Sequence, residues 1–204
     1  MNDNKPPHSA TSSQAFNAWL LQVGADVRVA VGHYELKHIQ TITTSQVANQ
    51  RAVELAAHSY LVSHRVPIAP RHCQRFIVWN KYVLPIVDVA LLIDALLPPQ
   101  TPSVCNDYPP SEVAGAGAQT LLAITAYRDN SSDKLSYGGL LLQETPQSIT
   151  VMAAQERPLT LLPSVWQVVS HAAFEHNDAV IPVLNLANLF CYSFDALHRA
   201  TQAA

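Results

Sequence analysis

The chain has 204 residues, of which 49% are hydrophobic and 13% are charged, and its formal net charge at pH 7 is −3. This composition is too apolar for a disordered chain and provides enough apolar surface for a buried core. The 12 lysines and arginines form no run or stripe, which argues against a nucleic-acid-binding surface.

The N-terminal residues 1–14 are rich in Pro, Ser, Thr and Asn and are expected to form a flexible tail. Such residues bury too little apolar surface to offset the entropy of ordering. The tail lacks the apolar stretch of a signal peptide, and no later run reaches the roughly 18 apolar residues of a membrane-spanning helix. Residues 15–204 are predicted to form a single domain.

Two strands are predicted within residues 18–39, on either side of a tight turn at Gly24–Asp26. In the second strand Val27, Val29 and Val31 alternate with Arg28 and Ala30, so one face can be buried.

An extra helical insertion is predicted near residues 43–60 and extending to Val62, because Val47, Arg51 and Leu55 recur at helical spacing. The stretch VPIAP that follows, Val66–Pro70, is too rigid for the interior of a helix.

A β-hairpin is predicted next, with strands Phe76–Trp79 and Tyr82–Ile86 joined by a turn at Asn80-Lys81. A short helix should follow, capped by Asp88 and ended by Pro98-Pro99.

The region 98–119 contains five prolines and two glycines and is predicted to be a long surface loop. β-rich segments follow it over residues 120–127, 135–144, 147–152 and 165–174. A helix over 185–200 is expected to close the chain.

One stretch of the chain occurs twice. KYVLPIVDVALLI, which begins at Lys81, recurs 97 positions later as DAVIPVLNLANLF, which begins at Asp178. The copies share Val, Pro, Ala and Leu at four equivalent positions, and Asp88 corresponds to Asn185. Either side chain can cap a helix N-terminus, so each copy is predicted to be a strand that leads into a short capped helix.

Pro85 and Pro182, which are equivalent in the two copies, cannot donate to a strand ladder and are expected at an edge or bulge near the strand's end. A similar pair of β-rich runs precedes each copy, WLLQVG and VRVAVG in one half and TLLAIT and YGGLLLQE in the other. Two halves with the same order of elements predict the duplication of a small barrel.

In their order and spacing, these motifs resemble the CheW-like domain of bacterial chemosensory proteins over about residues 18–190. VPIAP matches the family's VPGAP, and FIVWNKYVLPIVDVALLI follows its GVINLRGxVLPVIDLxxLL. YGGLLLQETPQSITV resembles VGLLVDEVxxV, and DAVIPVLNLANLF resembles the closing xxVPLLDLxxLF.

The resemblance implies a mainly β fold of two SH3-like five-stranded β-barrels packed around a shared core, with short helices. It implies no catalysis. Members of the family couple the cytoplasmic tips of chemoreceptors to a CheA-type histidine kinase, whose regulatory domain has the same fold. Free strand edges and an apolar groove between the barrels would suit such association.

The chain departs from the family at the hairpin. The family's coupling-associated arginine falls on Asn80, its next glycine on Lys81 and an earlier glycine on Arg75. Asparagine cannot form the charged fork of arginine, and lysine restricts a turn that requires positive φ. Trp79 is expected either in the core or as an exposed interface anchor. The predicted partner-binding residues are Val66, Arg75, Phe76, Trp79, Asn80 and Lys81.

The leading hypothesis is therefore a cytoplasmic, non-enzymatic adaptor that binds a CheA-type kinase or a chemoreceptor tip, with no cofactor, no nucleic acid and no membrane insertion. Three scattered cysteines suit a reducing compartment. One alternative is an enzyme that uses Asp, His and Cys residues gathered on a duplicated barrel. Another is a nucleic-acid binder, which would need a basic aromatic face.

The nine histidines do not predict a metal site. His33-x-Glu35-x-x-His38 lacks the residue order of the HExxH metalloprotease motif. The other histidines form no HxH pair, and the cysteines form no CxxC pair.

Overall fold

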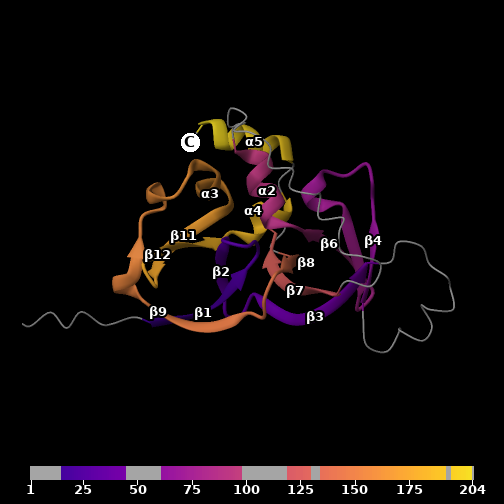
Figure 1. Ribbon diagram of the computed structural model, residues 1–204, viewed down its shortest axis with the longest axis horizontal. Coiled ribbons are helices and arrows are strands. Elements are labelled where there is room, and N and C mark those ends of the chain that lie inside the picture. Colours follow the sequence, from indigo (N-terminus) through magenta and orange to yellow (C-terminus); the bar gives the residue numbers. More distant parts are fainter. Residues whose placement is uncertain (1–14, 45–60, 98–118, 130–133, 192–193, 204) are drawn as a thin grey trace, which may run out of the picture.

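Two six-stranded β-units make up most of the computed structural model, which describes residues 15–44, 61–97, 119–129, 134–191 and 194–203 (Figure 1). One unit is a closed barrel with the strand order β4 (Leu61–Arg65), β5 (Arg75–Trp79), β6 (Tyr82–Val87), β8 (Leu135–Leu142), β7 (Gln119–Arg128) and β3 (Leu36–Thr44). The other is a sheet with the order β10 (Glu156–Arg157), β11 (Ser170–His176), β12 (Ala179–Leu184), β2 (Arg28–Gly32), β1 (Ala15–Gln22) and β9 (Gln147–Met152).

Short helices connect and cover these strands. The α-helices are α2 (Val89–Leu96), α3 (Ser164–Val169), α4 (Leu186–Cys191) and α5 (Phe194–Ala203). The 3₁₀ helices are η1 (Arg71–Cys73), η3 (Ala153–Gln155) and η4 (Leu159–Leu161). The predicted mainly β fold with two packed units and short helices is confirmed, although each unit has six strands and the second unit is not closed by hydrogen bonds.

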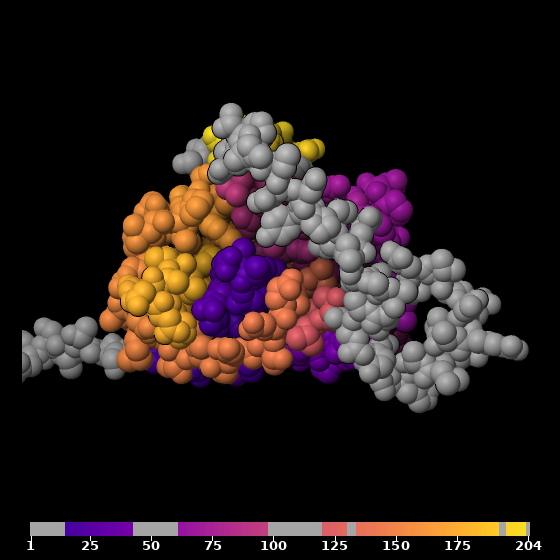
Figure 2. Space-filling model, viewed as in Figure 1, coloured from indigo at the N-terminus to yellow at the C-terminus, as the bar shows by residue number. Residues whose placement is uncertain are grey.

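Each unit combines strands from both halves of the chain. The β1–β2 hairpin from the first half lies in the sheet between β12 and β9, and the β7–β8 hairpin from the second half lies in the barrel between β6 and β3. Parallel pairs join the halves, Val183 with Ala30 in the sheet and Ile86 with Gly139 in the barrel. Figure 2 shows indigo N-terminal residues enclosed by orange and yellow residues of the C-terminal half. The strand orders of the two units thus correspond one to one, and the duplicated halves are intertwined.

The two units differ in closure because their linking segments differ in length. In the barrel β3 pairs with β4 in parallel, for example Ile42 with Leu61, across residues 45–60. The corresponding strands of the sheet, β9 and β10, are joined only by the three-residue η3. A parallel pair needs a crossover of about a dozen residues or more, so β9 and β10 cannot pair in the same way.

The hairpins in the two copies of the repeat have the same turn. Asn80 and Lys81 have φ values of 47° and 70°, and Asn177 and Asp178 have 49° and 61°. Two consecutive positive φ values are typical of the type I′ turn, whose twist suits a two-residue hairpin. The predicted turn at Asn80-Lys81 is therefore confirmed, and its counterpart lies 97 positions later.

The repeat's two prolines occupy equivalent places. Pro85 lies opposite Phe76, and Pro182 lies opposite Ala173. Both are at positions where the strand nitrogen faces away from the hairpin partner. On that other side, pairing with β8 or β2 begins only at the next residue, Ile86 or Val183. Each proline therefore lies at a locally unpaired stretch of its strand, as the missing N–H requires.

Three apolar clusters fill the molecule. The largest contains Val29, Val31, Leu92, Leu140 and Leu184, among others, so it joins both units and their helices. A second fills the barrel around Ile77 and Leu84, and a third lies inside the sheet around Phe174 and Ile181. The shared core that the family resemblance implied is thus present.

The predicted buried face of the second strand is confirmed, and the other face is buried as well at Ala30. Val29 and Val31 face the shared core, and Ala30 faces the interior of the sheet unit, and all three are fully buried. A small Ala at the second face permits the close packing that such a central strand needs.

Three other predicted elements differ from the structure in extent or type. Thr43 and Thr44 finish β3, and Leu61 and Val62 begin β4, so the helix predicted over that region does not include them. Val165–Val169 is helical, although a strand was predicted there, because Val165 and Val169 are spaced to bury one helical face in the shared core. The closing helix is two helices, α4 and α5.

Several predictions fall on residues outside the described part of the chain. These are the tail 1–14, the central part of the insertion at 45–60, and the Pro-rich loop apart from Gln119, which begins β7.

Candidate protein-interaction surface

The β5–β6 hairpin carries an apolar surface on the outside of the barrel. Along β5, Ile77 points into the barrel and is fully buried, whereas its neighbour Val78 is 53% exposed. Val78 lies opposite Val83, which is 66% exposed, and the adjacent Tyr82 is 56% exposed. We call the following residues the hairpin surface: Phe76, Val78, Asn80, Lys81 and Val83. Tyr82 pairs with Trp79 and lies with it on the opposite face of the hairpin.

An aromatic cluster supports the turn end of this surface. The Trp79 ring meets the Tyr137 ring edge-on with centroids 5.5 Å apart, and Tyr82 packs against Tyr137 at the same distance. Trp79 is half-buried and packs against the barrel's apolar cluster. Of the two alternatives left by the sequence, the structure therefore places Trp79 at the rim of the core, where it holds Tyr137 under the exposed Tyr82.

Phe76 extends the hairpin surface along β5. Its half-buried ring stacks on His64 of β4, with centroids 5.2 Å apart and an interplanar angle of 26°. Phe76 and Val78 point to the same side of the strand because residues two apart share a face.

The turn of the hairpin carries Asn80 and Lys81, and both residues are exposed. The only charge at this turn is the Lys81 ammonium, one position after the place of the family's arginine. A lysine provides a compact charge on a flexible stem and lacks the bidentate fork of arginine.

Val66 and Arg75 lie at the opposite end of the hairpin from this turn. The Val66 N–H donates a 2.7 Å hydrogen bond to the Gln74 carbonyl, and Arg75 begins β5. A five-residue strand separates them from Asn80 and Lys81 by roughly 16 Å. The structure therefore brings Phe76, Asn80 and Lys81 into one surface, places Trp79 on the opposite face of the hairpin, and leaves Val66 and Arg75 at the hairpin's base.

Arg75 also has a structural role at the start of α2. Burial raises the pKa of Asp88, and the backbone N–H groups of Leu91 and Ala90 and the charge of Arg75 oppose the rise. The Asp88 side chain accepts a 3.0 Å hydrogen bond from the Leu91 N–H, which confirms it as the N-cap. The charge of Arg75 therefore favours the ionised form of this half-buried carboxylate.

Sequence reasoning did not include Val78 and Val83 among the predicted contacts. Side chains alternate between the two faces of a strand, so Val78 must face outward once Ile77 is known to face the barrel interior. Tyr137 had no such signal, because its proximity to Trp79 depends on the pairing of β6 with a strand from the other half of the chain.

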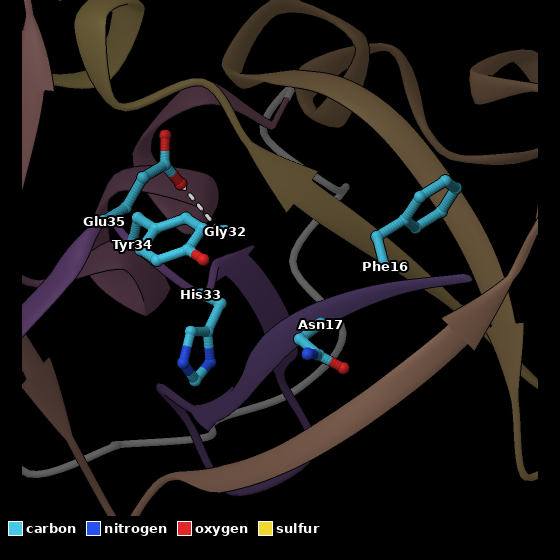
Figure 3. Close-up of a pocket in the computed structure, with 6 residues that line it drawn as sticks. All are labelled: Phe16, Asn17, Gly32, His33, Tyr34 and Glu35. Atoms are coloured by element: carbon cyan, nitrogen blue, oxygen red, sulfur yellow. Dashed lines mark hydrogen bonds between the residues drawn. The ribbon is translucent and has the colours of Figure 1, made fainter. Parts of the chain in front are cut away.

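A pocket of about 460 Å³ that is open to solvent lies at the other unit (Figure 3). It is lined by Phe16, Asn17, Gly32, His33, Tyr34 and Glu35. The Glu35 carboxylate accepts a hydrogen bond from the Gly32 N–H, and Nδ1 of His33 is buried without a hydrogen-bond partner in the described structure. None of the lining residues is a Ser, Thr, Cys or Lys.

The described residues provide no cluster of three or more His, Cys, Asp or Glu side chains that could hold a metal ion. Within the same residues, no helix is long and apolar enough to cross a bilayer.

Comparison with solved structures identifies the fold. The chain is similar to the crystal structure of the scaffolding protein TtCheW from Thermoanaerobacter tengcongensis, with a TM-score of 0.56 and 10% sequence identity over 89% of this chain and 96% of that chain. The chain has a CheW-like fold. No protein-family model and no curated protein sequence matches it. The structural comparison therefore confirms the CheW-like fold predicted from the ordered motifs. The sequence identity of 10% is too low for a comparison of sequences alone to find this match.

Proposed function

We propose that the protein is a cytoplasmic, non-enzymatic adaptor of a bacterial chemosensory array, which binds a CheA-type histidine kinase or a chemoreceptor tip through the hairpin surface. The observation that carries the proposal is the exposed pair Val78 and Val83 on the outer face of the hairpin, on a fold shared with a CheW scaffolding protein. Apolar and aromatic side chains that are held rigidly at a surface are typical of protein interfaces.

The geometry favours docking of a folded partner onto the face of the hairpin. The outer edges of β5 and β6 are paired only at the base of the hairpin, at Phe76 with His64 and at Ile86 with Gly139, so toward the turn they offer only short unpaired stretches for strand addition. The side chains of the hairpin surface must therefore supply the contacts. Val78 and Val83 would form their centre, Phe76 would extend it, and Lys81 would contribute a charge at the rim.

The direct test is a binding measurement between the purified protein and the CheA-type kinase and receptor signalling fragment of the same cell. Val78→Asp and Val83→Asp each place a charge at the centre of the surface and should weaken binding at least tenfold. Both side chains are solvent-exposed, so the melting temperature should stay close to that of the parent.

Leu161→Asp is the matched control. Leu161 is an exposed leucine next to the sheet unit, outside the hairpin surface, and its substitution should leave binding unchanged. Failure of the parent protein to bind either partner would refute the adaptor function, and normal binding by both valine variants would move the interface elsewhere.

Asn80→Arg tests whether the family's contact survives at the turn. If the partner keeps an acidic or carbonyl-lined site for that arginine, the substitution should strengthen binding through a charge-assisted fork. Unchanged affinity would show that the contact has been abandoned and that the valines act without it.

A further inference from the structure

The pocket on the sheet unit is built on a turn that connects the two units. Residues 32–35 lead from β2 of the sheet into β3 of the barrel. The Gly32 N–H donates to Glu35 Oε2 at 2.6 Å, and the Glu35 N–H donates to the Gly32 carbonyl at 2.9 Å. The Glu35 carbonyl accepts a 2.8 Å hydrogen bond from the Ala126 N–H of β7. The turn is therefore fixed to both units and holds its side chains in set positions.

Aromatic rings form the walls of this pocket. Tyr34 is 85% exposed and Phe16 is 47% exposed, and Figure 3 shows them on opposite sides of the pocket. The His33 ring stacks on Trp19 with centroids 5.6 Å apart and an interplanar angle of 7°, and Tyr34 meets the His33 ring edge-on at 5.5 Å. The Trp19 indole N–H donates to the His33 carbonyl at 3.2 Å. This support keeps an almost fully exposed tyrosine on a rigid base.

The pocket carries one negative charge and no positive one. Glu35 is its carboxylate, and none of its lining residues is a lysine or arginine. The structure gives Glu35 no ion pair with any described residue. Only Oε2 is used by the Gly32 N–H, so the carboxylate retains acceptor capacity for a cation.

We propose that this pocket binds the guanidinium group of an arginine side chain on a protein partner. A guanidinium stacks on aromatic faces and is less strongly hydrated than an ammonium, and its planar fork pairs with a carboxylate. Tyr34 and Phe16 supply the faces, and Glu35 supplies the charge. The volume of about 460 Å³ is in the range of small-ligand sites and accommodates a single side chain.

That the arginine belongs to a protein rests on the proposed adaptor function, but the pocket can be tested alone. The probe is the peptide acetyl-Gly-Arg-Gly-amide, titrated into the full ¹⁵N-labelled chain while the amide resonances of Gly32, His33 and Tyr34 are followed by NMR. These resonances should shift saturably, and raising the salt concentration should weaken binding. The same peptide with citrulline in place of arginine keeps the shape without the charge and should bind at least fivefold more weakly.

Two variants separate the aromatic and charged contributions. Tyr34→Ala and Glu35→Gln should each weaken the arginine peptide by about fivefold or more. Glutamine keeps an oxygen acceptor for the Gly32 N–H, so Glu35→Gln preserves the turn, and an unchanged melting temperature checks this. Tyr82→Ala removes an exposed tyrosine from the other unit and should leave the peptide affinity unchanged.

Three results would overturn the site: no saturable shifts, equal binding of the citrulline peptide, or unchanged affinity in both pocket variants. Such a result leaves the adaptor function intact if the kinase or receptor still binds through Val78 and Val83. If the peptide binds as expected but neither kinase nor receptor is captured, the pocket stands and the adaptor function fails.

Discussion

Asp88 and Asn185 cap the helices that follow the two hairpins in the same way. Each side-chain oxygen accepts a hydrogen bond from the amide three residues later, at 3.0 Å in both cases. Each residue also donates its own N–H over 2.8 Å, Asp88 to the His72 carbonyl and Asn185 to the Val169 carbonyl. His72 and Val169 are again 97 positions apart. The repeat is thus preserved in hydrogen bonding as well as in sequence, and only the charge of the cap differs.

The negative charge of the Asp88 cap, which Asn185 lacks, predicts that Asp88→Asn stabilises the protein at neutral pH. Burial raises the pKa of Asp88 above its ordinary value of 3.8, so ionisation of this group opposes folding. The stability associated with the protonated form is present below the unfolded pKa and is lost as the pH rises through the folded pKa. Urea unfolding at pH 3 and pH 7 should show little difference from the parent at pH 3 and a more stable variant at pH 7.

Asn185→Asp is the reciprocal control, since it places a charge at the equivalent cap and should destabilise the protein at pH 7. If Asp88→Asn were less stable than the parent at pH 7, the attraction of the carboxylate to Arg75 and to the helix N-terminus would outweigh the cost of its burial.

Lys81→Gly should stabilise the first hairpin. Lys81 has a φ of 70°, and the left-handed region costs a non-glycine residue roughly 1–2 kcal/mol. Part of this gain is lost because glycine is more flexible in the unfolded chain, so the free energy of unfolding should rise by about 0.5–1 kcal/mol. Lys134→Gly removes another exposed lysine, at a position without positive φ, and should give no gain in the same denaturant titration. A loss of stability in Lys81→Gly would mean that the lysine side chain makes a compensating contact.

Gly138→Ala should destabilise the contact between α4 and the barrel. A methyl group at Gly138 would overlap the ring of Phe190, which also stacks on Tyr127 with centroids 5.1 Å apart. Overpacking of this kind costs about 1–3 kcal/mol. Because Phe190→Leu makes room for the methyl group, the double variant should lose less than the sum of the two single losses. Strict additivity in this double-mutant cycle would show that the two residues do not interact.

Neighbouring residues of β5 should respond oppositely to the same substitution. Ile77→Asp buries an unpaired charge in the barrel and should prevent folding, as should Leu84→Asp on β6. Val78→Asp faces solvent and should fold with a near-parental circular dichroism spectrum and melting temperature. Val183→Asp tests the sheet unit in the same way, since Val183 packs against its interior cluster. Parental melting of the Ile77 variant would show that the inward face of β5 is not part of the core.

The sequence was most informative where the structure depends on neighbours along the chain. The turn at Asn80-Lys81 and the cap at Asp88 follow from residue types that favour these conformations locally. The spacing of Pro85 and Pro182 revealed the duplication for the same reason. The helix at Val165–Val169 was missed because three valines in six residues favour a strand, and burial against the shared core decides otherwise.

Relationships between distant segments could not be read from the sequence. Nothing near Ala30 indicates that it pairs with Val183, so the exchange of hairpins between the halves was not foreseen. The same holds for the site. The hairpin that carries Phe76, Trp79, Asn80 and Lys81 was predicted, but which of its side chains face solvent depends on which side the barrel lies. The pocket beside Tyr34 could not be predicted either, because it forms only when β1 lies alongside β2 and extends past the turn that follows β2.

The exchange of hairpins has a consequence for synthesis on the ribosome. Translation delivers β1 and β2 first, yet their lateral neighbours β9 and β12 emerge only in the last third of the chain. All six barrel strands, by contrast, are available once Leu142 has emerged. The nascent chain can therefore complete the barrel before the partners of Leu20 and Ala30 in the sheet's cluster have emerged. A chaperone that recognises apolar strands would meet this protein at that stage.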